Sequence, residues 1–364
     1  MKKMTFLAAM LAGMAATAPG FAQQYEQEPF AVYKFPAGKI EKVTVSTIGG
    51  SIRINGNATD SAVVEVRIRP LKRKLSKEEI QKILNDEFAM DTKVVEGELQ
   101  AIVSRKTRLT KAERQLTISF YVSVPQKVST ASKTSGGSIH IQRLNGRHDL
   151  NTSGGSLHIE NVGGHVTGHT SGGSIHISGG TGTTELVTSG GSIHAEQLQG
   201  GNYTFKTSGG SVNLNNISGN VIAATSGGSI RLIDLTGSID AKTSGGSVHA
   251  ARVSGTLHTG TSGGNMRLQN IAGNLDAKTS GGSMNVQMTS VYKYVRLTNS
   301  GNISLSLPEG KGYTLKIHSS DKINTSSLDN FSGIFESKNI DGTLNGGGAE
   351  ITVKSSQRVN LTFE

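Results

Sequence analysis

The hydrophobic pattern of residues 134–297 repeats about every 18 residues. In the unit that begins at Thr152, Leu157 and Ile159 are apolar, and His158 between them is polar. Alternation with a period of two is typical of a β-strand with one buried face. A second alternating pair occurs near the end of the units, as in Ile239 and Ala241. Each unit therefore predicts two short strands.

A Thr-Ser-Gly-Gly-Ser/Asn motif marks the start of every unit, and a fixed period of this length indicates one supersecondary unit stacked many times. Glycines at positions three, four and about thirteen of the unit, counted from its threonine, predict chain corners because glycine reaches positive φ without a Cβ clash. Only the fourth unit is 19 residues long. The nine copies of the motif begin at Thr134, Thr152, Thr170, Thr188, Thr207, Thr225, Thr243, Thr261 and Thr279.

These features predict an all-β fold, a parallel β-solenoid (β-helix) with 18-residue coils and two short strands per coil. One coil cannot bury its apolar face alone, so stability depends on stacking. Nine coils would form a rod about 43 Å long. An antiparallel run of β-hairpins would have the same period, but it would need two-residue turns such as Asn-Gly. The corners do not show such turns regularly, so the parallel solenoid is favoured.

The segment before the regular repeats contains an early relative of the coil and one helix. Residues 47–54 (TIGGSIRI) match the start of a repeat. Ser76 followed by Glu79 forms a capping box, and Ile80, Ile83 and Leu84 give the following helix an apolar stripe. We expect this helix to cap the open edge of the solenoid. Further strands are expected at residues 62–68, 99–104 and 115–124.

The chain accordingly divides into four predicted parts. The first is a signal peptide, the second a β-rich cap with an inserted helix and the first coils, the third the regular solenoid, and the fourth a set of degenerate coils with a C-terminal cap. Their bounds are residues 1–22, 23–130, 131–297 and 298–364.

The N-terminal segment predicts export. Lys2 and Lys3 precede a short apolar stretch at residues 6–16, and small residues lead to an expected cleavage between Ala22 and Gln23. That stretch is too short for an ordinary membrane span, and no later segment is suited to cross as a helix. We expect the protein in the periplasm, associated with the outer membrane, or at the cell surface.

Charge and composition limit the classes of partner and cofactor that the protein is expected to bind. The chain has no cysteine, which excludes disulfides and thiolate metal sites. Removing Lys2 and Lys3 lowers the formal charge from +10 to +8, so an envelope glycan, an anionic surface component or a protein is an expected partner. Nucleic acid is not expected, because the chain has no tryptophan and few aromatic residues to stack on bases. No cofactor or bound metal is predicted.

Position seven of the coil carries the main candidate ligand-binding residues. It lies between two buried positions and should point outward, so successive coils would stack these side chains in a column about 4.8 Å apart. Neighbouring imidazoles could share a divalent metal, or attract anions when protonated below about pH 6.5. The column could also be a solvated surface copied as the repeats duplicated. Its candidate binding residues are His140, His158, His176, His194, Arg231, His249 and Arg267, with Asn213 and Asn285 at the remaining positions.

Position sixteen provides an alternative acid–base column of Asp240, His258 and Asp276 on three consecutive coils. Two carboxylates beside a histidine could act as general acid and base on a sugar chain. The simpler interpretation is an exposed column of ion pairs, because no third group orients a nucleophile. No catalytic residue is therefore assigned.

Several segments together resemble the bacterial "putative adhesin" family, a group defined by a domain of unknown function. They are TIGGSIRI at 47–54, the helix after Ser76, FYVSVP at 120–125, the TSGGS coils, and GGGAEITV at 346–353. The resemblance covers most of residues 30–364. It implies a β-solenoid protein of the envelope or cell surface, and it supplies no established catalytic residues.

The functional expectation is a non-catalytic exported β-solenoid that acts as an adhesin-like, ligand-binding envelope or surface protein. One alternative is a carbohydrate-active β-helix enzyme, although the 18-residue period leaves no room for the long loops that build a cleft in such enzymes. The other alternative is a periplasmic structural or envelope-stress component.

Overall fold

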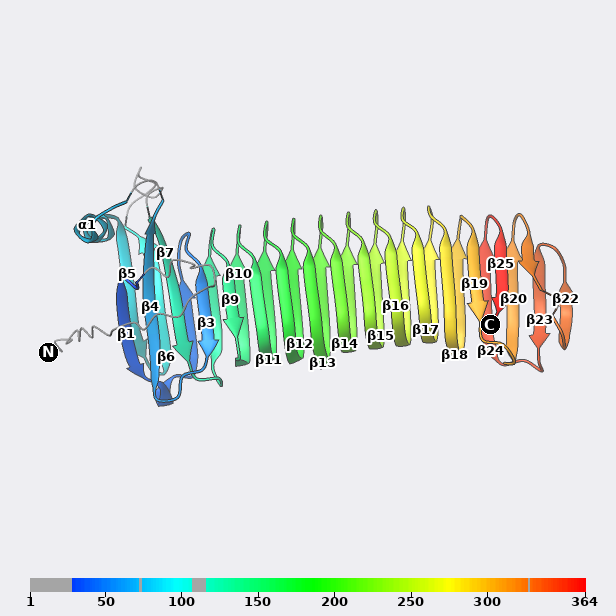
Figure 1. The fold of residues 1–364 in the computed structure, drawn as a ribbon, viewed down its shortest axis with the longest axis horizontal. Coiled ribbons are helices and arrows are strands. Elements are labelled where there is room, and N and C mark those ends of the chain that lie inside the picture. The colour runs from blue at the N-terminus through cyan, green and yellow to red at the C-terminus, as the bar shows by residue number, and fades with distance from the viewer. Residues whose placement is uncertain (1–27, 72–73, 107–115, 327) are drawn as a thin grey trace, which may run out of the picture.

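The protein is a straight rod built from one continuous β-structure (Figure 1). The computed structural model describes residues 28–71, 74–106, 116–326 and 328–364. The predicted signal peptide lies outside these residues. Within them, no helix is both long and apolar enough to cross a membrane.

The middle of the rod consists of coils that pair in parallel and in register, which confirms the predicted solenoid. Leu157 pairs with Ile175 and His158 with His176, one period away. The strands of this part are β8 (Ser129–Thr134), β9 (Ile139–Gln142), β10 (Asn145–Thr152), β11 (Leu157–Thr170), β12 (Ile175–Thr188), β13 (Ile193–Thr207), β14 (Val212–Thr225), β15 (Ile230–Thr243), β16 (Val248–Thr261), β17 (Met266–Thr279) and β18 (Met284–Asn299).

Each regular coil is one long bent strand whose two halves correspond to the two predicted short strands. The bend lies at position ten, where non-glycine residues such as Asn161 (φ 53°) and Asp234 (φ 56°) adopt the left-handed conformation. A second bend lies at position thirteen, for example at Gly237 (φ 129°). The corner at position thirteen was predicted, whereas the corner at position ten was not.

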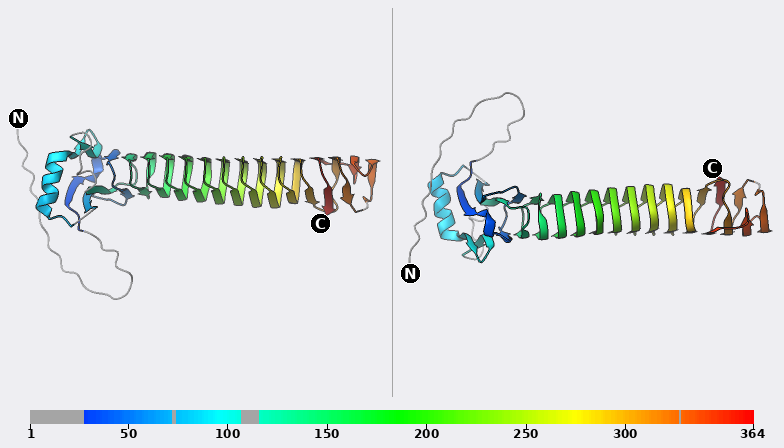
Figure 2. Two further views of the ribbon diagram at one scale, coloured as in Figure 1. Left: turned by 90° about the horizontal axis from the view of Figure 1, so that it is seen from above. Right: turned by 90° about the horizontal axis from the view of Figure 1, so that it is seen from below.

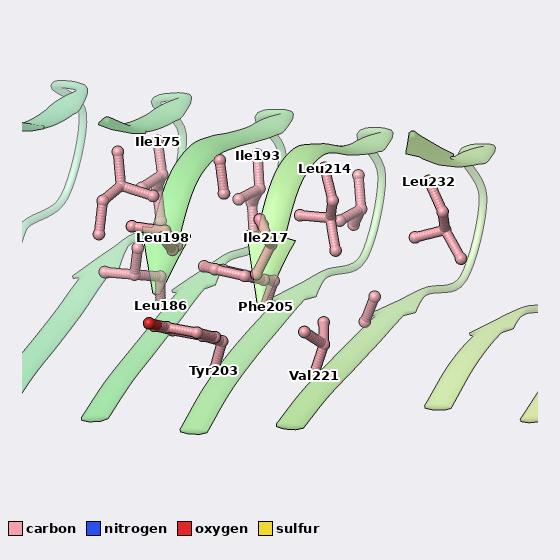
Figure 3. Close-up of a cluster of buried hydrophobic side chains, with 14 of the residues drawn as sticks. Ile175, Leu186, Ile193, Leu198, Tyr203, Phe205, Leu214, Ile217, Val221 and Leu232 are labelled. Atoms are coloured by element: carbon pink, nitrogen blue, oxygen red, sulfur yellow. The ribbon is translucent and has the colours of Figure 1, made fainter. Parts of the chain in front are cut away.

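The core lies between the two halves of the coils (Figure 3). Ile193 and Leu214 point inward from positions six and eight, and Leu186 and Phe205 point inward from the second halves of the coils that precede theirs. All four side chains are essentially inaccessible to solvent. Burying a side chain of this kind contributes about 1.5–3 kcal/mol, so every added coil strengthens the same continuous core.

The motif threonine and serine join successive coils through hydrogen bonds. Thr225 Oγ1 donates to the carbonyl oxygen of Gly210 at 2.7 Å and accepts from the N–H of Gly228 at 3.3 Å. The N–H of Ser229 donates to Ser211 Oγ at 3.2 Å. The repeated shape of the corner therefore depends on side chains as well as on the backbone hydrogen bonds between coils.

The glycine pair has a different role from the predicted one. Neither Gly227 nor Gly228 has positive φ, so the expectation of a left-handed corner is wrong here. A Cβ on Gly228 would lie 2.1 Å from the carbonyl oxygen of Gly210, whereas a Cβ on Gly227 would meet nothing nearer than 3.5 Å. The second glycine is required because adjacent coils approach too closely for any side chain.

At the N-terminal end, an early coil lies between two later ones. Strands β2 and β3 pair in parallel with β6 and β7 on one side and with β8 and β9 on the other. Strands β1, β4 and β7 pair antiparallel, as do β5 and β6. The elements are β1 (Ala31–Pro36), η1 (Ala37–Lys39), β2 (Lys42–Ser46), β3 (Ile52–Gly56), β4 (Ser61–Pro70), α1 (Lys77–Glu87), β5 (Phe88–Val95), β6 (Glu98–Arg105) and β7 (Leu116–Val124).

Helix α1 lies across this end of the rod, as the sequence predicted (Figure 2). The N–H of Glu79 donates to Ser76 Oγ at 3.2 Å, and the N–H of Ser76 donates to Glu79 Oε2 at 2.8 Å, which completes the capping box. Ile80 and Leu84 are buried, and Ile83 packs partly against the core. The helix therefore covers an edge that would otherwise expose unpaired strand groups.

The C-terminal end repeats this interleaving. Strands β24 and β25 pair in parallel with β18 and β19 on one side and with β20 and β21 on the other, and the antiparallel strands β23 and β22 follow beyond β20. The strands are β19 (Ile303–Leu307), β20 (Tyr313–Ser319), β21 (Ile323–Thr325), β22 (Phe331–Phe335), β23 (Asn339–Leu344), β24 (Ala349–Ser355) and β25 (Val359–Phe363).

Candidate functional site

The position-seven column exists as predicted, and it extends beyond the predicted residues. Backbone register places His140 beside His158, and then His176 and His194, on successive coils. Beyond His140 the column continues to Arg53 and then to Tyr121. The guanidinium of Arg53 lies 4.9 Å from the centre of the Tyr121 ring. The match of residues 47–54 to the repeat could have identified Arg53.

The four consecutive histidines form a stacked ladder. Their ring centres are separated by 5.8, 5.2 and 5.1 Å, and the last two steps have nearly parallel planes, 4° apart. His158, His176 and His194 line a shallow groove of about 170 Å³, with Glu160 and Glu196 along its edge. The groove follows the rod axis, so it fits an extended ligand better than a compact one.

This ring geometry does not favour a shared metal. The lone pairs of an imidazole lie in the ring plane, so parallel stacked rings direct them side by side rather than toward one point. Among the residues that the structure describes, no group of three or more His, Asp or Glu side chains is placed to hold a metal ion. Of the two ligand interpretations, the arrangement favours anion or hydroxyl contacts.

Burial sets the charge state of the ladder. It lowers the pKa of His140, and the nearby charges act in opposite directions, with Glu160 raising this pKa and Arg53 lowering it. Burial also lowers the pKa of His158 and His176, and neighbouring imidazoles lower them further. These rings are therefore mainly neutral at pH 7, and each offers one hydrogen-bond donor and one acceptor.

Farther along, the column becomes cationic. Arg231, His249 and Arg267 occupy position seven on three successive coils. Burial lowers the pKa of His249, and Arg231 and Arg267 lower it further. Two exposed guanidinium groups thus flank one imidazole that is neutral at pH 7.

The acid–base column is also present, but its contacts are those of ion pairs. Asp240 Oδ2 lies 2.8 Å from Lys242 Nζ, and His258 Nδ1 lies 3.9 Å from Asp276 Oδ2. These four residues border a groove of about 760 Å³, together with Lys278 and with Gly260, which lies between the two lysines on successive coils. Because Asp240 is engaged by Lys242 and the His258–Asp276 contact exceeds hydrogen-bond range, the column does not form a preassembled acid–base pair.

A further ion pair at position ten was not predicted. Arg252 Nε and Nη2 donate to the two carboxylate oxygens of Asp234 at 2.6 and 2.8 Å. Arg252 holds the pKa of the Asp234 carboxyl below its usual range. Opposite charges one period apart could have revealed this pair.

Comparison with known proteins gives one family match and two solved structures of low sequence identity. Residues 256–357 match the family described as Toastrack DUF4097. A crystal structure described as a putative cell adhesion protein from Clostridium sporogenes is 11% identical, covers 93% of this chain and 100% of its own, and has a TM-score of 0.17. One described as a putative adhesin from Bacteroides fragilis is 14% identical, covers 72% of this chain and 96% of its own, and has a TM-score of 0.27.

No curated protein matches the sequence. The family match includes the last regular coils, the C-terminal strands as far as β24 and the segment GGGAEITV that carried part of the resemblance. The predicted resemblance to a domain-of-unknown-function family is therefore confirmed over residues 256–357, which are similar to the Toastrack DUF4097 family.

Proposed function

We propose that this protein is a non-catalytic, exported, adhesin-like rod of the cell envelope that binds a glycan along its side. The position-seven column carries the proposal. From Arg53 to Arg267 it presents arginine, histidine and asparagine side chains at every coil, in register and pointing away from the core. Such a surface can contact successive units of an extended polymer.

The contacts of the alternative column support a non-catalytic role. Acid–base catalysis needs groups within hydrogen-bond reach of one another or of the substrate, and a covalent mechanism needs a nucleophile beside its base. Asp240 is instead bound to Lys242, and Asp276 lies 3.9 Å from His258. The 18-residue coils also leave these side chains on an open wall rather than in an enclosed cleft.

The envelope location rests on the sequence. The basic residues Lys2 and Lys3, the apolar stretch at residues 6–16 and the expected cleavage after Ala22 are typical of an export signal. The positive charge of the chain suits the acidic polymers of an envelope surface.

The glycan-binding proposal is tested by applying the purified full-length protein to an array of envelope polysaccharides. We expect binding that is reduced in the quadruple variant His140→Ala, His158→Ala, His176→Ala and His194→Ala, because these changes remove donors and acceptors from four successive coils. A matched control replaces His165 and His169, which lie on the opposite wall, by alanine. Absence of glycan binding, or equal loss in the control, would refute the proposed surface.

Location and catalysis are tested separately. External protease applied to intact cells should remove a surface-exposed protein, whereas a periplasmic protein would be protected until the outer membrane is opened. Detection of the protein only in the cytoplasm would contradict export. Release of reducing sugar that disappears in Asp240→Asn would support the enzyme alternative and overturn a non-catalytic role.

A further inference from the structure

The cationic end of the column lies in surroundings without a free carboxylate. Coils 225–278 contain only three acidic residues. Asp240 and Asp276 lie at position sixteen on the opposite wall, and Asp234 is bound through both oxygens to Arg252. Arg231 and Arg267 are therefore exposed guanidinium groups with no carboxylate on the neighbouring positions of their wall.

The flanking columns are small or neutral, which leaves this stripe accessible. On the three coils, position five holds Ser229, Ser247 and Asn265, and position nine holds Ile233, Ala251 and Gln269. Ala251 is buried and offers no contact surface, whereas Ser229 and Asn265 are exposed and Ile233 is partly exposed. These residues add hydroxyl, amide and apolar groups, all of which suit sugar rings.

The spacing of the charges is fixed by the fold. Arg231 and Arg267 are two rungs apart, on the order of 9.6 Å along the rod, and His249 lies halfway between them. The order along the stripe is thus cation, neutral hydrogen-bonding group, cation, because burial and both arginines keep the pKa of His249 low.

We propose that Arg231, His249 and Arg267 bind a linear acidic polysaccharide in which charged and neutral sugars alternate. Each guanidinium would pair with a carboxylate through two parallel hydrogen bonds. His249 would contact hydroxyl groups of the neutral sugar between them. This inference rests on the proposed function, since it names the class of glycan that the column binds.

A polysaccharide fits these residues better than a nucleic acid. Nucleic acids carry a phosphate on every residue, whereas only alternate rungs here carry a full charge. Binding of single strands also depends on aromatic side chains that stack on bases, and positions five, seven and nine of these three coils have no Phe, Tyr or Trp.

The test measures the affinity of the full-length protein for hyaluronan, in which a glucuronate alternates with a neutral N-acetylated sugar. Polygalacturonate, with a charge on every sugar, neutral dextran and single-stranded DNA serve as comparison ligands. The double variant Arg231→Gln/Arg267→Gln is compared with Lys242→Gln/Lys278→Gln. The control changes the same coils and the same net charge, two rungs apart, on the opposite wall.

We expect hyaluronan to bind more tightly than the comparison ligands, with binding that weakens as salt is added. The arginine variant should lose at least about fivefold in affinity, since two exposed charge contacts are removed, while the lysine control stays close to wild type. Thermal melting verifies that both variants fold.

Four results would overturn the inference. Equal loss in the lysine control would show general charge attraction, and equal or tighter binding of polygalacturonate or DNA would show that alternation is not recognised. Binding of neutral envelope glycans without any binding of hyaluronan would remove the inference and leave the proposed function intact. Failure to bind any glycan would remove both.

Discussion

Replacing each glycine of one motif pair separately by alanine gives the sharpest test of the coil geometry. Gly227 and Gly228 are adjacent and chemically identical, and neither has positive φ. A Cβ on Gly227 would make ordinary contacts at 3.5 Å, whereas a Cβ on Gly228 would lie 2.1 Å from the carbonyl oxygen of Gly210. The two substitutions therefore remove the same backbone freedom but differ in sterics.

The expected magnitudes follow from these distances. Gly227→Ala should stabilise the protein by about 0.4–1 kcal/mol, because alanine restricts the unfolded chain. In Gly228→Ala the two coils must separate locally by about 1 Å or more to restore normal contact. This movement would disrupt the hydrogen bonds of Thr225 to Gly210 and of Ser229 to Ser211, each worth about 1 kcal/mol, and add about 1–3 kcal/mol of strain. After the shared gain of about 0.4–1 kcal/mol from the restricted unfolded chain is subtracted, a net loss of about 2–5 kcal/mol is expected.

Denaturant unfolding followed by circular dichroism measures both variants against wild type. Because solenoids can unfold in parts, hydrogen exchange of the coil that contains residues 225–242 should accompany it and show where protection is lost. If the two variants differ by less than about 0.5 kcal/mol, the close-approach explanation of the second glycine is wrong.

Two further predictions concern single side chains. His148 is fully buried with Nδ1 3.0 Å from Thr130 Oγ1, and burial lowers its pKa to about 4. Because the unfolded histidine takes up a proton first, about 3 kcal/mol of stability that is present above pH 6.5 should be lost as the pH falls toward 4. His148→Leu should flatten this part of the stability–pH curve, whereas an unchanged slope would exclude His148 as its source. Ser76→Ala removes the hydroxyl that accepts from the N–H of Glu79 and should lower the unfolding free energy by about 1 kcal/mol. Ser76→Asp should retain most of the stability of the wild type. Equal stability of the wild type and both variants would mean that the cap contributes nothing.

The local sequence pattern predicted the coil well because each unit repeats the same alternation of buried and exposed positions. Alternation at positions six to eight, as in Leu157, His158 and Ile159, identified both the buried wall and the outward column. The helix after Ser76 could be predicted equally well, because a capping box and an apolar stripe are local signals. The bend at position ten was missed because its residues vary and include Arg252 and Gln197, which do not signal positive φ.

The sequence by itself determined the period, the buried positions and the residues of the column, because these depend on spacing within one coil. The tertiary structure alone decided the order of coils at both ends, where β2 and β3 enter between later coils and β24 and β25 between earlier ones. These pairings join segments that are far apart in the sequence, and no local period specifies which exposed edge a strand will cover. The role of the second motif glycine was likewise decided by the distance between neighbouring coils, which exists only once they stack.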